Sequence, residues 1–333
     1  MRVLVVKMSS LGDVIHTLPA LTDAARALPH CRFDWVVEEA FAEIPAWHPA
    51  VERVIPIALR RWRKNPLRDF TGPEWRQFRQ ALRKEHYDAV IDAQGLLKSA
   101  LVARLVKAPI FGMDKHSVRE RVASRGYHKK IAVDRELHAV ERIRQLFASA
   151  LKYPVPEEPG DYGVRQYLKP AKDDLPPSLL FFHGTARAEK LWPEGHWQAL
   201  ATHAGQAGFR VWMPWGTQEE RVRAERIEDE CAAVQVLPKL DLLGLAGMLL
   251  EVDGAVAVDT GLAHLAAALD VPTVSLYGPT DTRLIGAYGR NQVHIQSPVG
   301  VEQTTRPEEM MASITPDMAW TALQSALSDG SQS

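Results

Sequence analysis

Two successive α/β domains with doubly wound, Rossmann-like parallel sheets are the fold that this sequence predicts. Its 333 residues exceed the size that one hydrophobic core usually reaches. Short runs rich in Val, Ile and Leu, without polar alternation, alternate with helical stretches, which is typical of parallel strands covered on both faces. Because this alternation occurs twice, we expect two sheets that face each other across a cleft.

The predicted elements follow that pattern in order. The strands cover residues 2–7, 33–37, 53–58, 89–92, 179–183, 209–214, 234–237, 255–258 and 273–276. The helices cover 14–27, 74–85, 138–149, 194–206, 219–231, 262–269 and 316–328. Tyr153–Pro177 holds six prolines and is interpreted as a linker, since proline continues neither helices nor central strands. We therefore predict domains over 1–160 and 161–315, followed by a C-terminal helix and tail over 316–333.

The composition indicates the cellular compartment in which the protein works. The two cysteines, Cys31 and Cys231, have neither metal-like spacing nor a disulfide pattern, which favours a reducing compartment. The sequence opens on a strand-like run rather than a secretory signal. No apolar stretch approaches the roughly 18 residues that a spanning helix needs. We expect a cytoplasmic protein without a signal peptide or a transmembrane segment.

The overall net charge of −1 hides a strong asymmetry between the two halves. Residues 1–165 carry 28 Lys and Arg against 20 Asp and Glu, a net of +8. Residues 166–333 carry 12 against 21, a net of −9. The first half is therefore suited to meeting anions such as phosphates, nucleic acid or a lipid surface.

The first strand leads into a short polar loop, Lys7–Ser10, and then into a helix. Free backbone N–H groups at a helix N-terminus form a natural anion site, but one glycine, Gly12, does not make a dinucleotide fingerprint. Asp13 lies in the first turn, where its carboxylate could act as a general base toward an incoming hydroxyl. The alternative is that Asp13 only caps the helix or complements its dipole.

Two basic segments of the first half are candidates for binding anions. Arg60-Arg61-Trp62-Arg63-Lys64 places four cations in five residues at the end of a strand, where arginine can form paired hydrogen bonds to phosphate. A second segment, 115–130, contains Arg119, Arg121 and Arg125. A solvated charged surface is the alternative for either run.

The second half supplies two loops that follow buried strands. In the first loop, Thr185 and Lys190 are placed to bind a departing diphosphate, although a single loop lysine often only faces solvent. In the second, Thr260 and Gly261 would present backbone N–H groups to a phosphate, and Asp259 could hold a sugar hydroxyl. His264 follows in the first helical turn and faces either the cleft or the core. The turn 277–281 ends another strand at the same edge, though many turns share its composition.

In order along nearly the whole chain, these segments resemble the ADP-heptose:lipopolysaccharide heptosyltransferases, glycosyltransferase family 9. The matching pieces are 2–7 (RVLVVK), 10, 12–14, 17–20 (TLPA), 33–39 (FDWVVEE), 60–64, 88–99 (DAVIDAQGLLKS), 190–197, 214–216 and 258–264. The resemblance implies a GT-B fold, in which the first domain binds the acceptor and the second binds the nucleotide sugar. It implies inverting, metal-independent transfer of L-glycero-D-manno-heptose from ADP-heptose to the first Kdo of Kdo2-lipid A. No Asp-x-Asp motif stands in a convincing loop, so we expect no metal and no cofactor.

Residue by residue, the resemblance implies a set of roles. Asp13 matches the catalytic aspartate and Lys190 the lysine that supports the leaving diphosphate. The donor-binding positions are Thr185, Ala186, Lys190, Glu220, Leu240, Asp259, Thr260, Gly261, Leu262 and His264. The acceptor-binding positions are Ser10, Gly12, Arg60, Arg61, Arg63, Lys64 and Arg119. Two positions depart from the family: Ala186 stands where a second threonine is frequent, and Leu240 where methionine also occurs, so donor affinity could shift.

We expect this transferase to associate peripherally with the cytoplasmic face of the inner membrane through Arg60–Lys64, and a monomer is plausible. One rival hypothesis is a related transferase that adds the second heptose or another core sugar. A rival of a different class is a non-catalytic module that binds anions or nucleic acid, which we disfavour because no nucleic-acid motif accompanies the basic run. A nicotinamide-dependent oxidoreductase is disfavoured by the missing glycine fingerprint.

Overall fold

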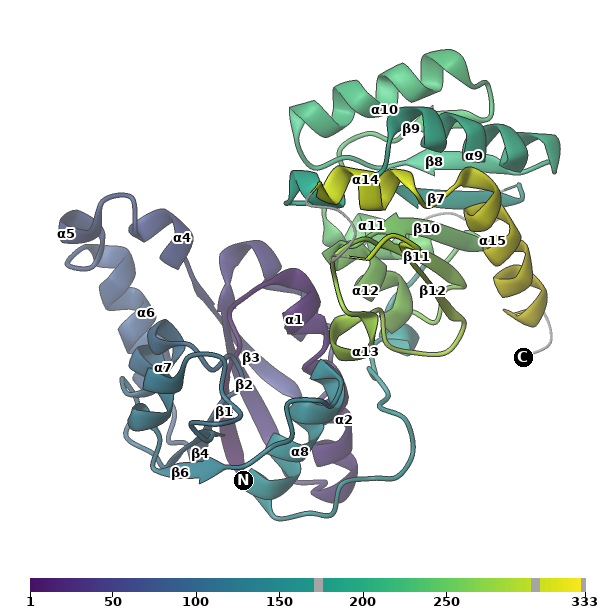
Figure 1. Ribbon diagram of the computed structural model, residues 1–333. Helices are drawn as coiled ribbons and strands as arrows, with labels where there is room; N and C mark the ends of the chain where they lie inside the picture. The colour runs from purple at the N-terminus through teal and green to yellow at the C-terminus, as the bar shows by residue number, and fades with distance from the viewer. Residues whose placement is uncertain (171–175, 301–305, 331–333) are drawn as a thin grey trace. The chain divides into compact units, whose positions relative to one another are not determined.

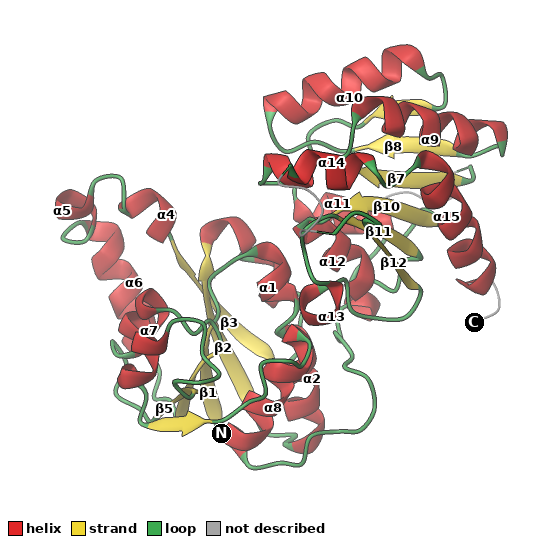
Figure 2. Cartoon of the chain, viewed as in Figure 1, coloured by secondary structure: helices red, strands yellow, loops and turns green. Residues whose placement is uncertain are grey.

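The computed structural model describes residues 1–170, 176–300 and 306–330. The chain forms two compact units, Met1–Val164 and Arg165–Ser333, each with its own parallel sheet (Figures 1 and 2). The predicted linker lies around the junction of the two units, and its residues 171–175 are outside the described ranges, as are 301–305 and 331–333.

The first unit is built on a six-stranded sheet of order β3-β2-β1-β4-β5-β6. Its strands are β1 (Arg2–Val6), β2 (Arg32–Glu38), β3 (Val51–Ile57), β4 (Ala89–Asp92), β5 (Ile110–Met113) and β6 (Lys129–Ile131), and every neighbouring pair is parallel. Its helices are α1 (Leu11–Ile15), α2 (Leu18–Ala27), α3 (Glu43–Ala46), α4 (Leu59–Trp62), α5 (Pro66–Asp69), α6 (Pro73–Arg83), α7 (Leu97–Ala103) and α8 (Ala139–Leu151), with 3₁₀ turns at Glu39–Phe41 and Arg121–Gly126.

The second unit repeats the arrangement with a sheet of order β12-β11-β10-β7-β8-β9. Its strands are β7 (Ser178–Phe182), β8 (Arg210–Met213), β9 (Val234–Val236), β10 (Gly254–Val258), β11 (Thr273–Tyr277) and β12 (Gln292–Gln296), again all parallel. Its helices are α9 (Glu194–Gln206), α10 (Gln218–Glu230), α11 (Leu242–Leu249), α12 (Gly261–Ala268), α13 (Thr282–Ile285), α14 (Pro307–Ala312) and α15 (Pro316–Gly330), with 3₁₀ turns at Arg165–Tyr167 and Ala188–Lys190.

Read from the first strand of each unit, the two sheets share the Rossmann strand order 3-2-1-4-5-6. The central strands β1, β7 and β10 are buried along almost their whole length, because their side chains are apolar on both faces. The predicted doubly wound α/β fold is confirmed in both units. In each, the strand order reverses between two central strands, β1 and β4 or β7 and β10, and the loops after these strands meet at that switch point.

Each sheet is covered by its own hydrophobic core. In the first unit, β1, β3 and β4 pack with α6, α7 and the Trp62 side chain. In the second, α9, α10 and α15 cover one face of the sheet, and α15 contacts α9, β10, β11 and β12 (Figure 1). The predicted C-terminal helix is therefore part of the second unit's core. None of the helices in the described ranges is long and apolar enough to span a bilayer.

The structure corrects the predicted elements in two ways. The helix expected over 14–27 is two helices, because Pro19 lacks a backbone N–H and lies in the first turn of α2. Strands β5, β6 and β12 were not predicted. They are short, and residues such as Gly112, Lys129 and His294 interrupt the apolar pattern that identifies a buried strand.

Candidate functional site

The loop between β1 and α1 is held in place by a glutamine from the neighbouring strand end. The Met8 and Ser9 backbone N–H groups both donate to Gln94 Oε1, at 2.7 and 3.1 Å. The Gln94 amide donates in return to the Ser9 carbonyl at 2.6 Å. Gln94 follows β4, whose last residue, Asp92, accepts the backbone N–H groups of Gln94 and Gly95. The loop that ends at Ser10, just before Gly12 in α1, is thus held by the Gln94 side chain, which Asp92 anchors at the end of β4.

Asp13 projects from the first turn of α1 with its carboxylate about one-third exposed, at 34%. Its Oδ2 atom accepts the Ser10 backbone N–H at 3.0 Å and the Ser10 hydroxyl at 2.9 Å. Its Oδ1 atom lies 3.3 Å from the buried Lys7 ammonium, which also donates to the Ala93 carbonyl at 3.1 Å. A carboxylate oxygen has two lone pairs, so Oδ1 keeps one for a further donor.

The surroundings of Asp13 keep its carboxylate ionised. Burial by itself raises the pKa of Asp13, but the Lys7 charge and the hydrogen bonds from Ser10 outweigh burial, and the pKa is lowered. The capping contact that we considered as an alternative role is present, since Ser10 N–H bonds the Asp13 side chain. That contact uses Oδ2 and leaves Oδ1 bonded only to Lys7 among the described residues, so the two roles do not exclude each other.

Of the predicted basic run, Arg60 and Arg61 have partners within the first unit. The Arg60 backbone N–H donates to the buried Glu38 carboxylate at 3.0 Å, and its guanidinium lies 5.2 Å from the Phe41 ring centroid. Arg61 is bound on two sides, by Glu39 at 3.2 Å and by Glu74 at 2.9 Å. Hydrogen bonds to these two carboxylates raise the pKa of Arg61. The charge of Arg61 is therefore largely compensated within the protein.

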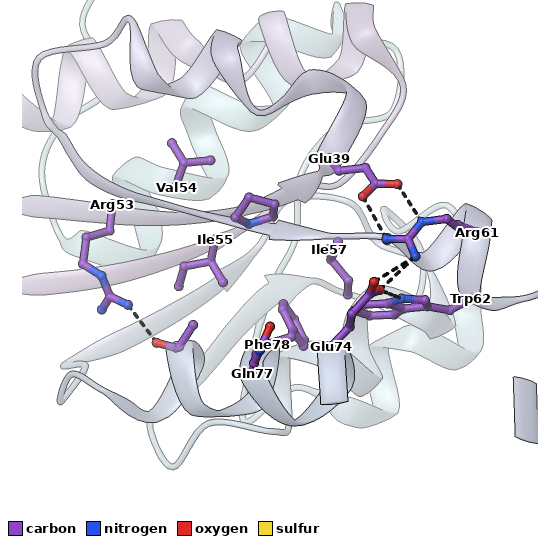
Figure 3. A pocket seen from close by; sticks show the side chains of 13 residues that line it. Glu39, Arg53, Val54, Ile55, Ile57, Arg61, Trp62, Glu74, Gln77 and Phe78 are labelled. Carbon is purple, nitrogen blue, oxygen red and sulfur yellow. Dashed lines mark hydrogen bonds and ion pairs between the residues drawn. The ribbon is translucent and has the colours of Figure 1, made fainter. Parts of the chain in front are cut away.

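Arg61, Glu39 and Glu74 line part of a groove beside the edge strand β3 (Figure 3). Its volume is about 300 Å³. Apolar side chains of β3 and α6, including Ile55, Ile57 and Phe78, line it, while Arg61 and Glu74 meet at one end. The Trp62 indole N–H also donates to Glu74, at 2.8 Å, so this carboxylate joins α4 to α6.

The remaining predicted acceptor residues face solvent. Arg63 and Lys64 are exposed in the turn between α4 and α5. Arg119 is exposed and lies in the segment after β5, beside the turn that follows β4. A Cβ added to Gly95 would lie 3.5 Å from the Arg119 backbone nitrogen, and the Glu120 backbone N–H donates to the Gly95 carbonyl at 3.0 Å. The Arg119 backbone therefore lies beside the turn that follows Gln94, the residue that holds the loop before α1.

In the second unit, Asp259 joins the loops after three strands. Its carboxylate forms an ion pair with Lys190, and its backbone carbonyl accepts the Thr185 hydroxyl at 2.9 Å. The Thr280 hydroxyl, after β11, also donates to the Asp259 carboxylate. Lys190 and Asp259 are each 12% exposed. Three of the predicted donor residues are thus in direct contact, and the Lys190 ammonium is held at the carboxyl edge of the sheet.

The loop after β10 continues into the N-terminus of α12. Thr260 is the N-cap residue and makes no side-chain capping bond, so Gly261 and Leu262 begin the helix with backbone N–H groups open to a ligand. Both are partly exposed, whereas His264 is buried at 7% exposure. The predicted phosphate position is therefore built from backbone, with His264 on the protein side of the helix.

Besides its predicted role in binding the nucleotide-sugar donor, Glu220 has hydrogen-bond partners within the protein. Its carboxylate accepts the backbone N–H groups of Gly216 at 2.7 Å and Thr217 at 3.2 Å, which caps α10. A Cβ on Gly184 would lie only 2.3 Å from Glu220 Oε1, so a side chain at this position would displace the Glu220 carboxylate. Leu240 is half-buried near the start of α11, and Ala186 is exposed after β7.

Sequence reasoning missed several residues that shape these sites. Lys7 and Gln94 support the Asp13 loop, and Thr280 supports Asp259. A charged residue at the end of an apolar strand was the available signal for Lys7. The pattern Thr217-x-x-Glu220 is a capping-box signature that could have predicted the cap of α10. Within the described ranges, no three His, Cys, Asp or Glu side chains gather as metal ligands would.

Two Rossmann-like units, each with a parallel sheet of the same strand order, are the architecture of the GT-B fold class. Among solved structures, the chain is similar to Escherichia coli heptosyltransferase WaaC with ADP, with TM-score 0.91, 47% identity and coverage of 98% of this chain and 100% of that one. It is also similar, with TM-score 0.87 and 45% identity, to WaaC with ADP-2-deoxy-2-fluoro heptose, covering 98% and 99% of the two chains.

Sequence comparisons agree with the structural ones. The model of glycosyltransferase family 9 (heptosyltransferase) matches residues 75–314. Lipopolysaccharide heptosyltransferase 1 of Pseudomonas aeruginosa is 57% identical over 298 residues, covering 89% of this chain and 84% of that protein. The protein of the same name from Escherichia coli K12 is 51% identical, covering 90% and 94%. The chain belongs to glycosyltransferase family 9, the heptosyltransferase family, and the predicted family and enzyme class are confirmed.

Proposed function

We propose that this glycosyltransferase moves L-glycero-D-manno-heptose from ADP-heptose to the first Kdo of Kdo2-lipid A, with inversion at the anomeric carbon. The observation that carries the proposal is the identity of 57% and 51%, over about nine-tenths of the chain, to proteins named lipopolysaccharide heptosyltransferase 1. The rival assignment, addition of the second heptose, is less well supported, because the similarity to Escherichia coli heptosyltransferase II is only 21% in identity.

The second unit is the proposed site of the donor. WaaC structures with ADP and with a fluorinated ADP-heptose support an ADP-linked sugar as the donor class. The diphosphate would lie against the N-terminus of α12, where the backbone N–H groups of Gly261 and Leu262 favour negative charge. Lys190 would stabilise the charge that develops on the leaving ADP, which is the role that a metal ion plays in other transferases.

Asp13 is the proposed general base. In a single displacement, the acceptor hydroxyl oxygen bonds to the anomeric carbon while the bond from that carbon to the diphosphate oxygen breaks. ADP leaves with the bonding electron pair, and the hydroxyl proton passes to Asp13 Oδ1. The ionised state of Asp13 and the open lone pair on Oδ1 support this assignment.

The acceptor's lipid requires contact with a membrane. We place the enzyme at the cytoplasmic face of the inner membrane, as a peripheral protein that approaches the bilayer with the turn between α4 and α5. Arg63 and Lys64 are exposed in that turn, Arg68 is exposed in α5, and Leu67 of α5 is 90% exposed. Each basic residue near an anionic surface contributes on the order of 1 kcal/mol. A monomeric state remains part of the prediction.

The test is acceptor-dependent ADP release from ADP-heptose by the wild-type protein. We expect release with Kdo2-lipid A and a product heavier by one heptose, in the presence of a chelator as well as in its absence. An acceptor that already carries the first heptose should not support release. Preference for that second acceptor would establish the rival assignment, and loss of activity with chelator would overturn metal independence.

A further inference from the structure

Arg142, in the first turn of α8, has a buried guanidinium nitrogen without a partner. Its Nε atom has no contact with solvent and no hydrogen-bond acceptor among the described residues. A guanidinium has five N–H donors, and leaving one of them buried and unpaired costs free energy. Such an arrangement is typical of a site that an anionic ligand completes.

The first turn of α8 lies beside the helix that carries Asp13. The ring of His138, the N-cap residue of α8, is 5.3 Å from the ring of His16 at the end of α1, in an edge-to-face contact. The Arg142 guanidinium is close enough to Asp13 for their charges to interact. Burial first, and then the charges of Arg135 and Arg119, lower the pKa of Arg142, while Asp13 acts in the opposite direction.

Arg119, Arg135 and the Asp13 carboxylate all lie close enough to Arg142 for their charges to act on it. The Arg119 backbone lies beside the turn at Gly95, directly after Gln94. None of Arg119, Arg135 and Arg142 forms an ion pair with the residues that the structure describes, and the Asp13 carboxylate already forms one with Lys7. The cluster carries excess positive charge beside the proposed base, so it fits an anion rather than a neutral sugar.

We propose that Arg142, assisted by Arg119 and Arg135, binds the carboxylate of the acceptor sugar whose hydroxyl Asp13 deprotonates. This inference rests on the proposed function. Carboxylate and phosphate share the same arginine chemistry, but the Kdo carboxylate belongs to the ring that carries the nucleophilic hydroxyl. The phosphates of lipid A lie on other sugars, further from Asp13. Arg142 would also screen the repulsion between the acceptor carboxylate and the Asp13 carboxylate.

The experiment crosses enzyme variants with acceptor variants. The enzymes are wild type, Arg142→Met, Arg142→Lys and the control Arg83→Met, an exposed arginine at the end of α6. The acceptors are Kdo2-lipid A, its carboxylate methyl esters, and a dephosphorylated form that retains the carboxylates. Acceptor KM, donor KM and melting temperature are measured for each enzyme. Calorimetric binding of free Kdo and its methyl ester is measured in parallel, because this readout needs no transfer.

For Arg142→Met we expect the acceptor KM to rise by about tenfold or more, as for the loss of a charged hydrogen bond. The donor KM and melting temperature should not change, and Arg142→Lys should recover part of the loss. Esterification of the carboxylates should raise the acceptor KM of the wild type by a similar factor. It should not raise the acceptor KM of Arg142→Met any further. Removal of the lipid A phosphates should change the acceptor KM of the two enzymes by the same factor.

Two results would overturn the assignment. If Arg142→Met stays as sensitive to esterification as the wild type, Arg142 does not bind the carboxylate. If it loses its sensitivity to dephosphorylation instead, Arg142 binds a lipid phosphate. A wild type that binds Kdo through Arg142 but transfers no heptose would refute the proposed function while leaving the carboxylate site intact.

Discussion

Each of the two units places a lysine–aspartate ion pair at the switch point of the same strand order, but the two pairs expose different partners. In the first unit, Lys7 is 6% exposed and Asp13 is 34% exposed. In the second, Lys190 and Asp259 are each 12% exposed, and Asp259 also accepts hydroxyl groups from Thr185 and Thr280. In the first pair, the aspartate carboxylate is the more exposed partner, and a buried lysine stabilises its charge. In the second pair, the aspartate binds the loops around it and holds the lysine ammonium in position.

The net charge of each half does not predict the chemistry of the proposed site that it contains. The first half has a net charge of +8 and yet carries the proposed base, while the second has a net charge of −9 and yet holds the proposed diphosphate site. Backbone N–H groups at α12 and one lysine, rather than an excess of cations, make the second site suitable for an anion. Net charge describes the long-range field, and the switch-point loops determine what binds.

The largest effect in this comparison is expected at Lys190. Lys190→Met removes the cation that we propose stabilises the leaving diphosphate, and we expect kcat/KM for ADP-heptose to fall by about 10²- to 10³-fold. The control is Arg187→Met, because Arg187 is an exposed cation in the same loop whose one ion pair with a described residue is to Glu189. Steady-state ADP release measures both variants. Equal effects at the two positions would show that Lys190 contributes only general positive charge.

The second prediction concerns Lys7, whose charge lowers the pKa of Asp13 against the effect of burial. In Lys7→Met that pKa rises, so the base stays protonated up to a higher pH. The acidic limb of the kcat–pH profile should move upward by about one unit or more. We expect kcat at pH 7 to fall by about tenfold, since small displacements of a reacting group are costly.

Lys84→Met is the control for this profile, because Lys84 is exposed at the end of α6. An unchanged acidic limb in Lys7→Met, with normal folding, would show that Lys7 does not set the ionisation of Asp13.

The third prediction tests how tightly the second site is packed. Gly184→Ala places a Cβ 2.3 Å from Glu220 Oε1, so the carboxylate that caps α10 must move. We expect the free energy of unfolding to fall by about 1–3 kcal/mol. Gly195→Ala is the matched control, because among the described residues no heavy atom beyond its chain neighbours and the backbone of α9 lies within 4 Å of its added Cβ, and it should stabilise by about 0.5–1 kcal/mol. Urea denaturation measures both, and equal midpoints would contradict the close contact.

The smallest effect is expected at Arg61. Its guanidinium is already bound by Glu39 and Glu74, whereas the Arg63 side chain is exposed. Arg61→Gln should raise the acceptor KM by less than about threefold, while Arg63→Gln should raise it by about fivefold or more. Acceptor titration at saturating donor measures the two. The reverse order would mean that the acceptor displaces Glu39 and Glu74 from Arg61.

How much the sequence could predict depends on whether a feature is local. The loops 7–13 and 259–264 follow apolar strands and precede helices, so their place at the sheet edge could be predicted, as could both folds. Strand β6 could not, because Lys129-Lys130-Ile131 has no apolar pattern. The predicted catalytic and binding roles remain predictions.

Contacts between distant residues had no sequence signal. Gln94 and Ser9 are 85 positions apart, and Lys190 and Asp259 are 69 apart. Only the parallel pairing of β1 with β4, and of β7 with β10, brings them together. The partners of Arg61 were missed for the same reason, because a dense basic run does not show which of its cations the fold itself neutralises.

The most direct test that one site holds the base and the other binds the donor is the variant Asp13→Asn. Its donor binding and its turnover are measured in the same preparation. Asparagine keeps the shape of the side chain and can still accept the Ser10 N–H, but it cannot take a proton. We predict that calorimetric affinity for ADP-heptose stays at the wild-type value, while ADP release with Kdo2-lipid A falls by about 10²-fold or more. Near-normal release with intact donor binding would contradict the account and leave Asp13 as a helix cap.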